Sequence, residues 1–517
     1  MLNTTPPQVS SLTPELIKLD NEAKRRIKSD INKGLLDDAI LQGYSKQGFE
    51  ISLEDLKKIR AEIESSQPQL PNNSAMINND KIFASAELVD GKFSFNGSKD
   101  PTGDPSNPKN IINEHTMFPE ASVGKIRYAG LAYKMQQEGF FGKSGLQTNA
   151  KEFFLRPEIS AFLEEKFPDK KMQETILKLF NEENDKATLA DLLTHRAGIG
   201  DTTEHGKRLA KNIHGLGHDF TLADLLTDHQ QSKIERDPLS QKPLAKQPPL
   251  GELGVPVYGN HEYSNLGYQL IGLAMEAEYS TKTGNKKNYE ELLSEYMIKP
   301  IGCEETKFKT DESDNRINPS IISDKEGNLT AENPLNFNGA LSAGGVQTSI
   351  SDADKFYKEF FKGFPIGYDG ENFIHKEPKE ENKFFKQNTI EQMAKEAMKF
   401  SPANQWTIDN QKKLQAEYDS NPDLQKPRPE IPNPQYQFPG FVANMDNSGK
   451  IISYEKTGET FGGKSKLSHN PLTGENTISF DAKGADKASM TNINPSKTTK
   501  AQPPAKQLGE QTQRSNS

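Results

Sequence analysis

Alternating apolar and polar residues predict strands near both ends of the chain's central part. Residues 82–97 hold two alternating runs, I-F-A-S-A-E-L-V and K-F-S-F-N-G, separated by Asp-Gly, and this pattern is typical of a β-hairpin. The segments 450–456, 464–469 and 476–481 alternate in the same way and predict three consecutive strands. We expect all five strands to form one antiparallel sheet.

Between these strands the apolar spacing is helical. From Ser122 to Gly139 apolar residues recur near one helix face, residues 188–198 read as a short capped helix, and 263–276 passes from a loop into an apolar helix. The pattern therefore predicts an α/β (α+β) fold, in which an antiparallel sheet is flanked by helices and joined by a mostly helical subdomain.

Composition divides the chain into three parts. Residues 1–79 form a polar extension with one helix and a linker, and residues 80–484 form the folded domain. Within that domain 365–437 is rich in charge and proline and is predicted to be an insertion with one helix near 389–398. Residues 485–517 contain almost no large apolar side chains and are expected to be disordered.

Charge and cysteine content exclude several classes of function. The formal net charge of −9 argues against general affinity for nucleic acid or anionic membranes. Cys303 is the only cysteine, so no intrachain disulfide can form, and a lone cysteine is usually a packing residue. The N-terminus lacks a secretory signal and no run approaches the ~20 apolar residues of a membrane span. We expect a cytoplasmic protein, with non-classical secretion as the alternative.

Three short motifs carry the candidate chemistry: S-V-G-K at 122–125, Y-S-N at 263–265 and K-T-G at 456–458. A serine hydroxyl becomes a good nucleophile when a base takes its proton. Residues three apart share a helix face, so the Lys125 amine can reach the Ser122 oxygen. Lysine acts as a base only when its pKa falls, through burial or a neighbouring cation such as Lys456.

Other copies of these motifs lie in contexts that do not suit catalysis. S-x-x-K recurs at Ser106, in a Pro/Gly loop, and at Ser453, on a predicted strand where a residue three positions along faces the other way. Y-x-N recurs at Tyr258, and K-T-G recurs at Lys282 in what reads as a polar turn just after a helix. Only the motifs at 122–125, 263–265 and 456–458 lie, in this order, at a predicted helix start, in a loop that enters a helix and at the end of a predicted strand.

The order and context of the motifs resemble the serine β-lactamase and penicillin-binding-protein superfamily, whose motifs are S-x-x-K, Y-x-N or S-x-N, and K-T-G. T-L-A-D-L-L-T-H-R-A-G-I is similar to that family's L-L-T-H-T-S-G-L helix, and Y-S-N-L-G-Y-Q-L-I-G is similar to its Y-S-N-x-G-Y-x-L-L-G. N-G-A-L-S-A-G-G-V-Q-T-S-I-S-D at 338–352 is similar to the A-G-G segment followed by T-x-S-D. The resemblance covers roughly 80–482, sparsely across 365–435, and the tyrosine-led motif favours the class C β-lactamase, DD-peptidase and esterase branch.

The resemblance implies a serine hydrolase that forms an acyl-enzyme with an ester, amide or β-lactam. Ser122 would be the nucleophile, and Lys125 and Tyr263 would share the roles of base and proton shuttle. Lys456 would keep the site electropositive and favour Tyr263 as a phenolate. The substrate would be a small acyl or peptide molecule, and no metal or organic cofactor would be needed.

The same resemblance implies a set of substrate-binding residues. Asn265 would orient the substrate amide and help to hold Lys125, and Thr457 and Gly458 would line the edge of the cleft. The backbone N–H groups of Ser122 and Glu459 would form the oxyanion hole. Glu459 stands where relatives usually have a small residue, so its side chain should point away from the cleft.

Two other interpretations remain. His205, His214 and His218 form a histidine cluster, but the glycines between the last two weaken a zinc site. His195, within T-H-R-A-G, is expected to be structural or to support the site. The fold could also serve as a catalytically silent scaffold or a secreted interaction protein, and the sequence does not indicate an oligomeric state.

Overall fold

The computed structural model describes residues 82–99, 107, 110–168, 170–182, 184–200, 258–308, 320–323, 329–332, 341–376, 380–420, 428–460 and 463–486. All of them belong to one compact unit, Ile77–Ser517. The predicted N-terminal helix and linker, Ser106 and the histidine cluster lie outside the described residues.

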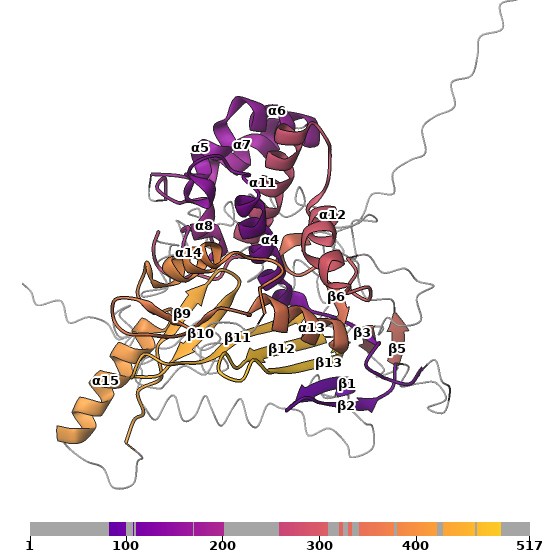
Figure 1. Ribbon diagram of the computed structural model, residues 1–517, viewed down its shortest axis with the longest axis vertical. Coiled ribbons are helices and arrows are strands. Elements are labelled where there is room, and N and C mark those ends of the chain that lie inside the picture. The colour runs from indigo at the N-terminus through magenta and orange to yellow at the C-terminus, as the bar shows by residue number, and fades with distance from the viewer. Residues whose placement is uncertain are drawn as a thin grey trace, which may run out of the picture. The chain divides into compact units, whose positions relative to one another are not determined.

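A nine-stranded sheet forms one layer of this unit (Figure 1). Seven strands follow one another in the order β2-β1-β13-β12-β11-β10-β9 and every neighbouring pair is antiparallel, as the sequence predicts. Their bounds are β1 Ile82–Val89, β2 Lys92–Gly97, β9 Gln435–Phe438, β10 Phe441–Met445, β11 Ile451–Thr460, β12 Gly463–His469 and β13 Asn476–Asp486. The remaining two strands are β4 Ser320–Ser323, which pairs with β13 in parallel, and β5 Leu329–Glu332, which pairs with β4.

The predicted hairpin is confirmed, and the backbone geometry of its turn suits the sequence Asp-Gly. Val89 pairs with Lys92, which leaves a two-residue loop. Asp90 has φ 49° and Gly91 has φ 71°. Positive φ at both positions is the geometry of a type I′ turn, which matches the twist of the two strands.

The middle of the chain supplies the helices that gather beside the sheet (Figure 1). They are α4 Lys125–Gln137, α5 Ala150–Leu155, α6 Pro157–Lys166, α7 Lys170–Lys178, α8 Leu189–Leu193, α11 Asn265–Thr283 and α12 Tyr289–Leu293, followed by α13 Ile350–Phe360. Every residue of α4 from Lys125 to Tyr133 is buried, so this helix is surrounded by protein rather than lying on the surface. Helix α13 packs against β13 and β1.

The capped helix expected at 188–198 is α8. The Thr188 hydroxyl accepts a hydrogen bond from the Asp191 amide, and the Asp191 carboxylate accepts one from the Thr188 amide. This capping box satisfies two amides at the helix start. The helix ends at Leu193, so His195 and Arg196 belong to the loop that follows it.

Three sequence expectations need correction. The segment 365–437 holds more than one helix: it contains the hairpin β7 Pro365–Tyr368 and β8 Phe373–His375, then α14 Gln387–Met398 and α15 Gln405–Ser420. Strand β13 extends to Asp486, past the expected boundary at residue 485, because its last residues pair with β4. Lys282 lies in the last turn of α11 and not in a turn after it. Ser453 is on β11, as predicted.

Short elements complete the fold. Strands β3 Met117–Pro119 and β6 Gln347–Ser349 pair with each other, and single turns of 3₁₀ or π-helix lie at 121–124, 145–147, 294–298, 299–301 and 341–343. Among the described helices, none has both the length and the apolar character required to cross a lipid bilayer.

Candidate active site

The nucleophile motif lies where the helices meet the sheet. Ser122, the candidate nucleophile, is in a 3₁₀ turn, Ala121–Gly124, which we call the nucleophile turn. Lys125 is the first residue of α4. The sequence pattern predicted that the helix begins at Ser122. The structure instead has a 3₁₀ turn there, in which residues three apart eclipse each other. Lys125 Nζ therefore lies 3.1 Å from Ser122 Oγ and donates a hydrogen bond to it.

Lys125 is fully buried and held by fixed acceptors. Its Nζ donates to Asn265 Oδ1 at 2.6 Å and to the Ala343 carbonyl at 2.5 Å. Asn265 is the first residue of α11, whose N-cap, Ser264, accepts a hydrogen bond from the Gly267 amide. The second motif thus reaches the nucleophile because α11 starts beside α4.

Tyr263 and Lys456 complete the group on the other side of Ser122. Tyr263 Oη donates a hydrogen bond to Ser122 Oγ at 2.6 Å. Lys456 Nζ, from β11, lies 4.7 Å from the centre of the Tyr263 ring, and Lys125 Nζ lies 4.9 Å from it. Side chains from three separate segments of the chain, Ser122 with Lys125, Tyr263 and Lys456, therefore lie close together.

Lys456 is a buried cation. Its side chain comes from the strand that borders the nucleophile turn, and burial lowers the pKa of its amine to about 8. Within the part of the chain that the structure describes, no carboxylate lies within ion-pair distance of it.

The rest of the K-T-G motif lines the same strand. A Cβ atom on Gly458 would lie 2.5 Å from the Glu120 carbonyl and 2.8 Å from the Ser122 nitrogen. The β11 backbone thus packs directly against the nucleophile turn, which only glycine permits. Thr457 is exposed. The Glu459 carboxylate is 71% exposed and lies 3.4 Å from Lys464 Nζ on β12, so its charge has a partner outside the nucleophile group.

A family model described as Beta-lactamase matches residues 102–420, well over half of the 517 residues. The chain belongs to the beta-lactamase family. The match confirms the β-lactamase/transpeptidase-like fold and includes the first two motifs of this family member. It ends before β11, so only the structure brings Lys456 to the site.

Solved structures resemble this beta-lactamase family member at low identity. A D-stereospecific amidohydrolase from Streptomyces sp. is 14% identical over 80% of this chain and 93% of its own, with a TM-score of 0.45. A D-amino acid amidase from Ochrobactrum anthropi SV3 is 15% identical over 78% and 87%, with a TM-score of 0.44. An octameric penicillin-binding protein homologue from Pyrococcus abyssi is 16% identical over 83% and 74%, with a TM-score of 0.46. No curated protein matches the chain in sequence.

His195 supports the Y-S-N loop of the family member. Its Nδ1 accepts a hydrogen bond from the Ser264 amide at 3.1 Å, and its ring lies 4.5 Å from the ring of Tyr263. Burial, with Lys456 and other nearby cations, holds the pKa of its imidazole well below the usual range. A neutral ring that accepts at Nδ1 carries its proton on Nε2. The sequence indicated a supporting role but not this contact, because the two loops are almost 70 residues apart.

Cys303 is buried, and burial raises the pKa of its thiol to about 12, so the thiolate is disfavoured at neutral pH. The described ranges contain no group of three or more His, Cys, Asp or Glu side chains that could hold a metal ion.

Replacing Gly458 with alanine is expected to slow the reaction of Ser122 by about 100-fold, because β11 must move away from the nucleophile turn. The rate of covalent labelling by a fluorophosphonate measures this effect, and circular dichroism checks the fold. If the folded Gly458→Ala protein labels at the parent's rate, the contact between β11 and Ser122 does not matter for reactivity.

Proposed function

We propose that this beta-lactamase family member is a serine hydrolase that acts through an acyl-enzyme on Ser122. The observation that carries the proposal is the position of Ser122 Oγ, 3.1 Å from Lys125 Nζ and 2.6 Å from Tyr263 Oη. A nucleophile with two proton-transfer groups in contact is the arrangement that activates a hydroxyl.

The contacts of Lys125 explain how it can act as a base. A neutral amine has two N–H groups and one lone pair. In that state Asn265 Oδ1 and the Ala343 carbonyl accept from its N–H groups, and the amine would accept the Ser122 proton across the 3.1 Å contact in which the ammonium donates.

The acylation step then follows. Ser122 Oγ attacks the acyl carbon while its proton passes to the neutral Lys125 amine. The tetrahedral intermediate collapses, the bond to the leaving group breaks, the Tyr263 phenol gives its proton to that group, and the Lys125 ammonium returns a proton to the phenolate. Lys125 and Lys456 stabilise negative charge that develops on the phenol oxygen. Water attacks the acyl-enzyme in the second half of the reaction and releases the acid.

The oxyanion is expected to bind between the nucleophile turn and β11. The backbone N–H groups of Ser122 and Glu459 are the proposed donors, and the close approach of Gly458 to Ser122 supports this pairing. Asn265 and Thr457 are proposed to hold a small acyl or peptide substrate. The buried charge of Lys456 favours a substrate with an anionic group, which suits a peptide or β-lactam better than a neutral ester.

Labelling of Ser122 tests the proposal. Fluorophosphonate and fluorescent penicillin are added to the parent, to Ser122→Ala and to Ser453→Ala, which removes the serine of the other S-x-x-K sequence on β11. We expect at least one probe to label the parent and Ser453→Ala, and neither probe to label Ser122→Ala. A catalytically silent scaffold would give no labelling of the parent and no turnover of nitrocefin or a p-nitrophenyl ester.

A further inference from the structure

A buried glutamate lies just before the nucleophile turn. The Glu120 side chain is fully buried and its backbone is held on both sides. Its amide donates to the Val346 carbonyl at 2.9 Å, and its carbonyl accepts from Ser465 Oγ on β12 at 2.6 Å. Two neighbouring regions of the fold therefore fix the position of this residue.

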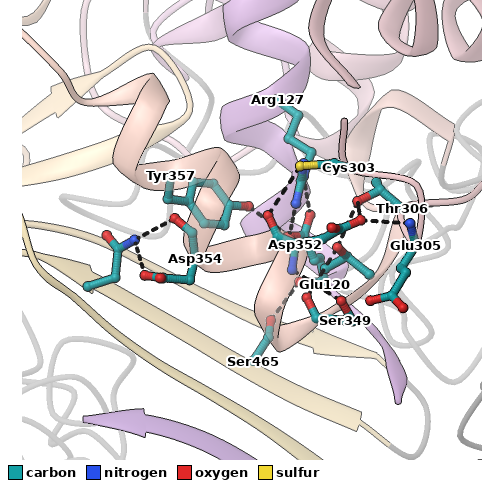
Figure 2. Close-up of polar contacts among 12 residues, drawn as sticks. Glu120, Arg127, Cys303, Glu305, Thr306, Ser349, Asp352, Asp354, Tyr357 and Ser465 are labelled. Atoms are coloured by element: carbon teal, nitrogen blue, oxygen red, sulfur yellow. Dashed lines mark hydrogen bonds and ion pairs between the residues drawn. The ribbon is translucent and has the colours of Figure 1, made fainter. Parts of the chain in front are cut away.

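The Glu120 carboxylate is held just as firmly (Figure 2). Arg127, on α4, donates from Nε to Oε2 at 2.8 Å and from Nη2 to Oε1 at 2.7 Å. Tyr357, on α13, donates to Oε1 at 3.0 Å. The Arg127 side chain is also fully buried and stacks 3.9 Å from the Phe356 ring centre. Such a two-bond arginine–carboxylate pair fixes orientation as well as distance.

The residue between this anchor and the nucleophile has an unfavourable backbone. Ala121 has φ 47°, in the left-handed region that residues with a Cβ atom rarely adopt. Such a conformation persists only when its surroundings impose it. The constraint comes from Glu120 on one side and from the start of α4 on the other, and Arg127 joins the two.

We propose that Glu120 and Arg127 are positioning residues that hold the strained Ala121–Ser122 turn in its reactive geometry. The inference rests on the proposed function and adds to it two residues outside the proposed catalytic group of Ser122, Lys125, Tyr263 and Lys456. Their ion pair joins residues seven positions apart, so the Ser122 hydroxyl and amide keep their places relative to Lys125 and β11.

The charge of Arg127 has a second consequence. The Glu120 carboxylate lies close to the beginning of α4, since its Oε2 is 3.7 Å from where a Cβ on Gly124 would be. An uncompensated negative charge there would oppose an oxyanion at the Ser122 amide. Arg127 neutralises the carboxylate and so preserves the favourable potential of the helix start.

A double-mutant cycle with a matched ion pair tests the inference. Glu120→Gln and Arg127→Met are made singly and together. The control is Glu278→Gln with Arg156→Met: Glu278 is also buried, accepts from the Phe141 amide and pairs with Arg156. Glu278 lies on α11 about 20 Å from Asn265 along the helix. Melting temperature, fluorophosphonate labelling rate, and kcat and KM for a p-nitrophenyl ester are measured.

Replacing both partners leaves no buried charge unpaired, so the double Glu120/Arg127 variant is expected to fold. Its labelling rate and kcat should fall about 100-fold with little change in KM, whereas the Glu278/Arg156 control should react like the parent. A folded double variant that reacts at the parent's rate would overturn the inference. A parent that does not label would instead count against the proposed function.

Tyr357→Phe keeps the test decisive if the double variant does not fold. It removes one hydrogen bond from Glu120 Oε1 and leaves the ion pair in place, so the protein should remain folded. Labelling is expected to slow about fivefold, and Arg127→Lys, which keeps the charge but loses the two-bond geometry, should recover part of the rate that Arg127→Met loses. Unchanged rates in Tyr357→Phe, or equal rates in Arg127→Lys and Arg127→Met, would contradict positioning by Glu120.

Discussion

Lys125→Met is expected to slow acylation of Ser122 by up to about 10⁴-fold, the upper range for loss of a general base. The methionine has a similar length and stays apolar, but it offers no lone pair to the Ser122 hydroxyl. Tyr263 would remain in contact with Ser122 Oγ at 2.6 Å and would supply the residual rate. Stopped-flow measurement of fluorophosphonate labelling gives the acylation rate directly.

The same variant should also lose stability. Asn265 Oδ1 and the Ala343 carbonyl would each lose the hydrogen bond from Lys125 inside the protein, and loss of a buried hydrogen-bond partner costs about 1–3 kcal/mol. The control is Lys134→Met on the same helix, where the lysine pairs with Glu138 nearer the surface. Lys134→Met should label like the parent. If Lys125→Met labels at the parent's rate, Lys125 is not the general base.

The acylation rate of the parent is expected to fall as pH rises through about 8, the value to which burial lowers the pKa of Lys456. Below this pH the ammonium faces Tyr263 and stabilises negative charge on its oxygen, and above it the charge is lost. Lys456→Arg should move the fall to much higher pH, because a guanidinium keeps its proton. Labelling rates measured from pH 6 to 10 test this. If the labelling rate falls at the same pH in the parent and in Lys456→Arg, the fall is due to the titration of another group.

Lys456→Met should separate activity from stability. We expect its labelling rate at pH 7 to fall to the level of the parent above pH 9, while its melting temperature rises. Burial lowers the pKa from 10.5 in the unfolded chain to about 8 in the folded one, so the charged amine costs the fold up to about 3 kcal/mol at neutral pH.

The sign of the pH effect on stability follows from the same shift. Between pH 8 and 10.5 the unfolded chain holds this proton more strongly, so the parent's free energy of unfolding should increase with pH across that window. Lys456→Met should lack this increase, and Lys466→Met, exposed on the neighbouring strand, should keep it. Chemical denaturation at several pH values measures both. A Lys456→Met protein less stable than the parent at pH 7 would contradict the cost of the buried charge.

Much of the candidate site was predictable because its residues sit in local patterns. The spacing of Ser122 and Lys125 is set by one turn of helix, and Tyr263 and Asn265 flank the cap of an apolar helix. The hairpin and the strands β11 to β13 were predictable from period-two alternation and turn residues. Each of these signals is contained within a short local segment.

The parts that could not be predicted depend on distant or backbone contacts. The Ala343 carbonyl that binds Lys125 belongs to the main chain, so no side chain marks it. The pairing of Glu120 with Arg127 looks like an ordinary surface pair in sequence, and only the packing of α13 and β12 around it shows its burial. The positive φ of Ala121 and His195 likewise has no signal in residue type.

The pairing of β1 with β13 joins the two ends of the domain, and it bears on when the proposed activity could begin. Leu88 lies opposite Ile478, about 390 residues later, and Lys456 lies on a strand that follows every described helix in the sequence. Contacts across such separations form slowly, since a long loop must close first. While the segment between Tyr263 and Lys456 is being translated, a nascent chain thus carries Ser122, Lys125 and Tyr263 without the strand that brings Lys456 to them, and we expect the proposed reactivity toward acyl groups to begin only after β11 has been made.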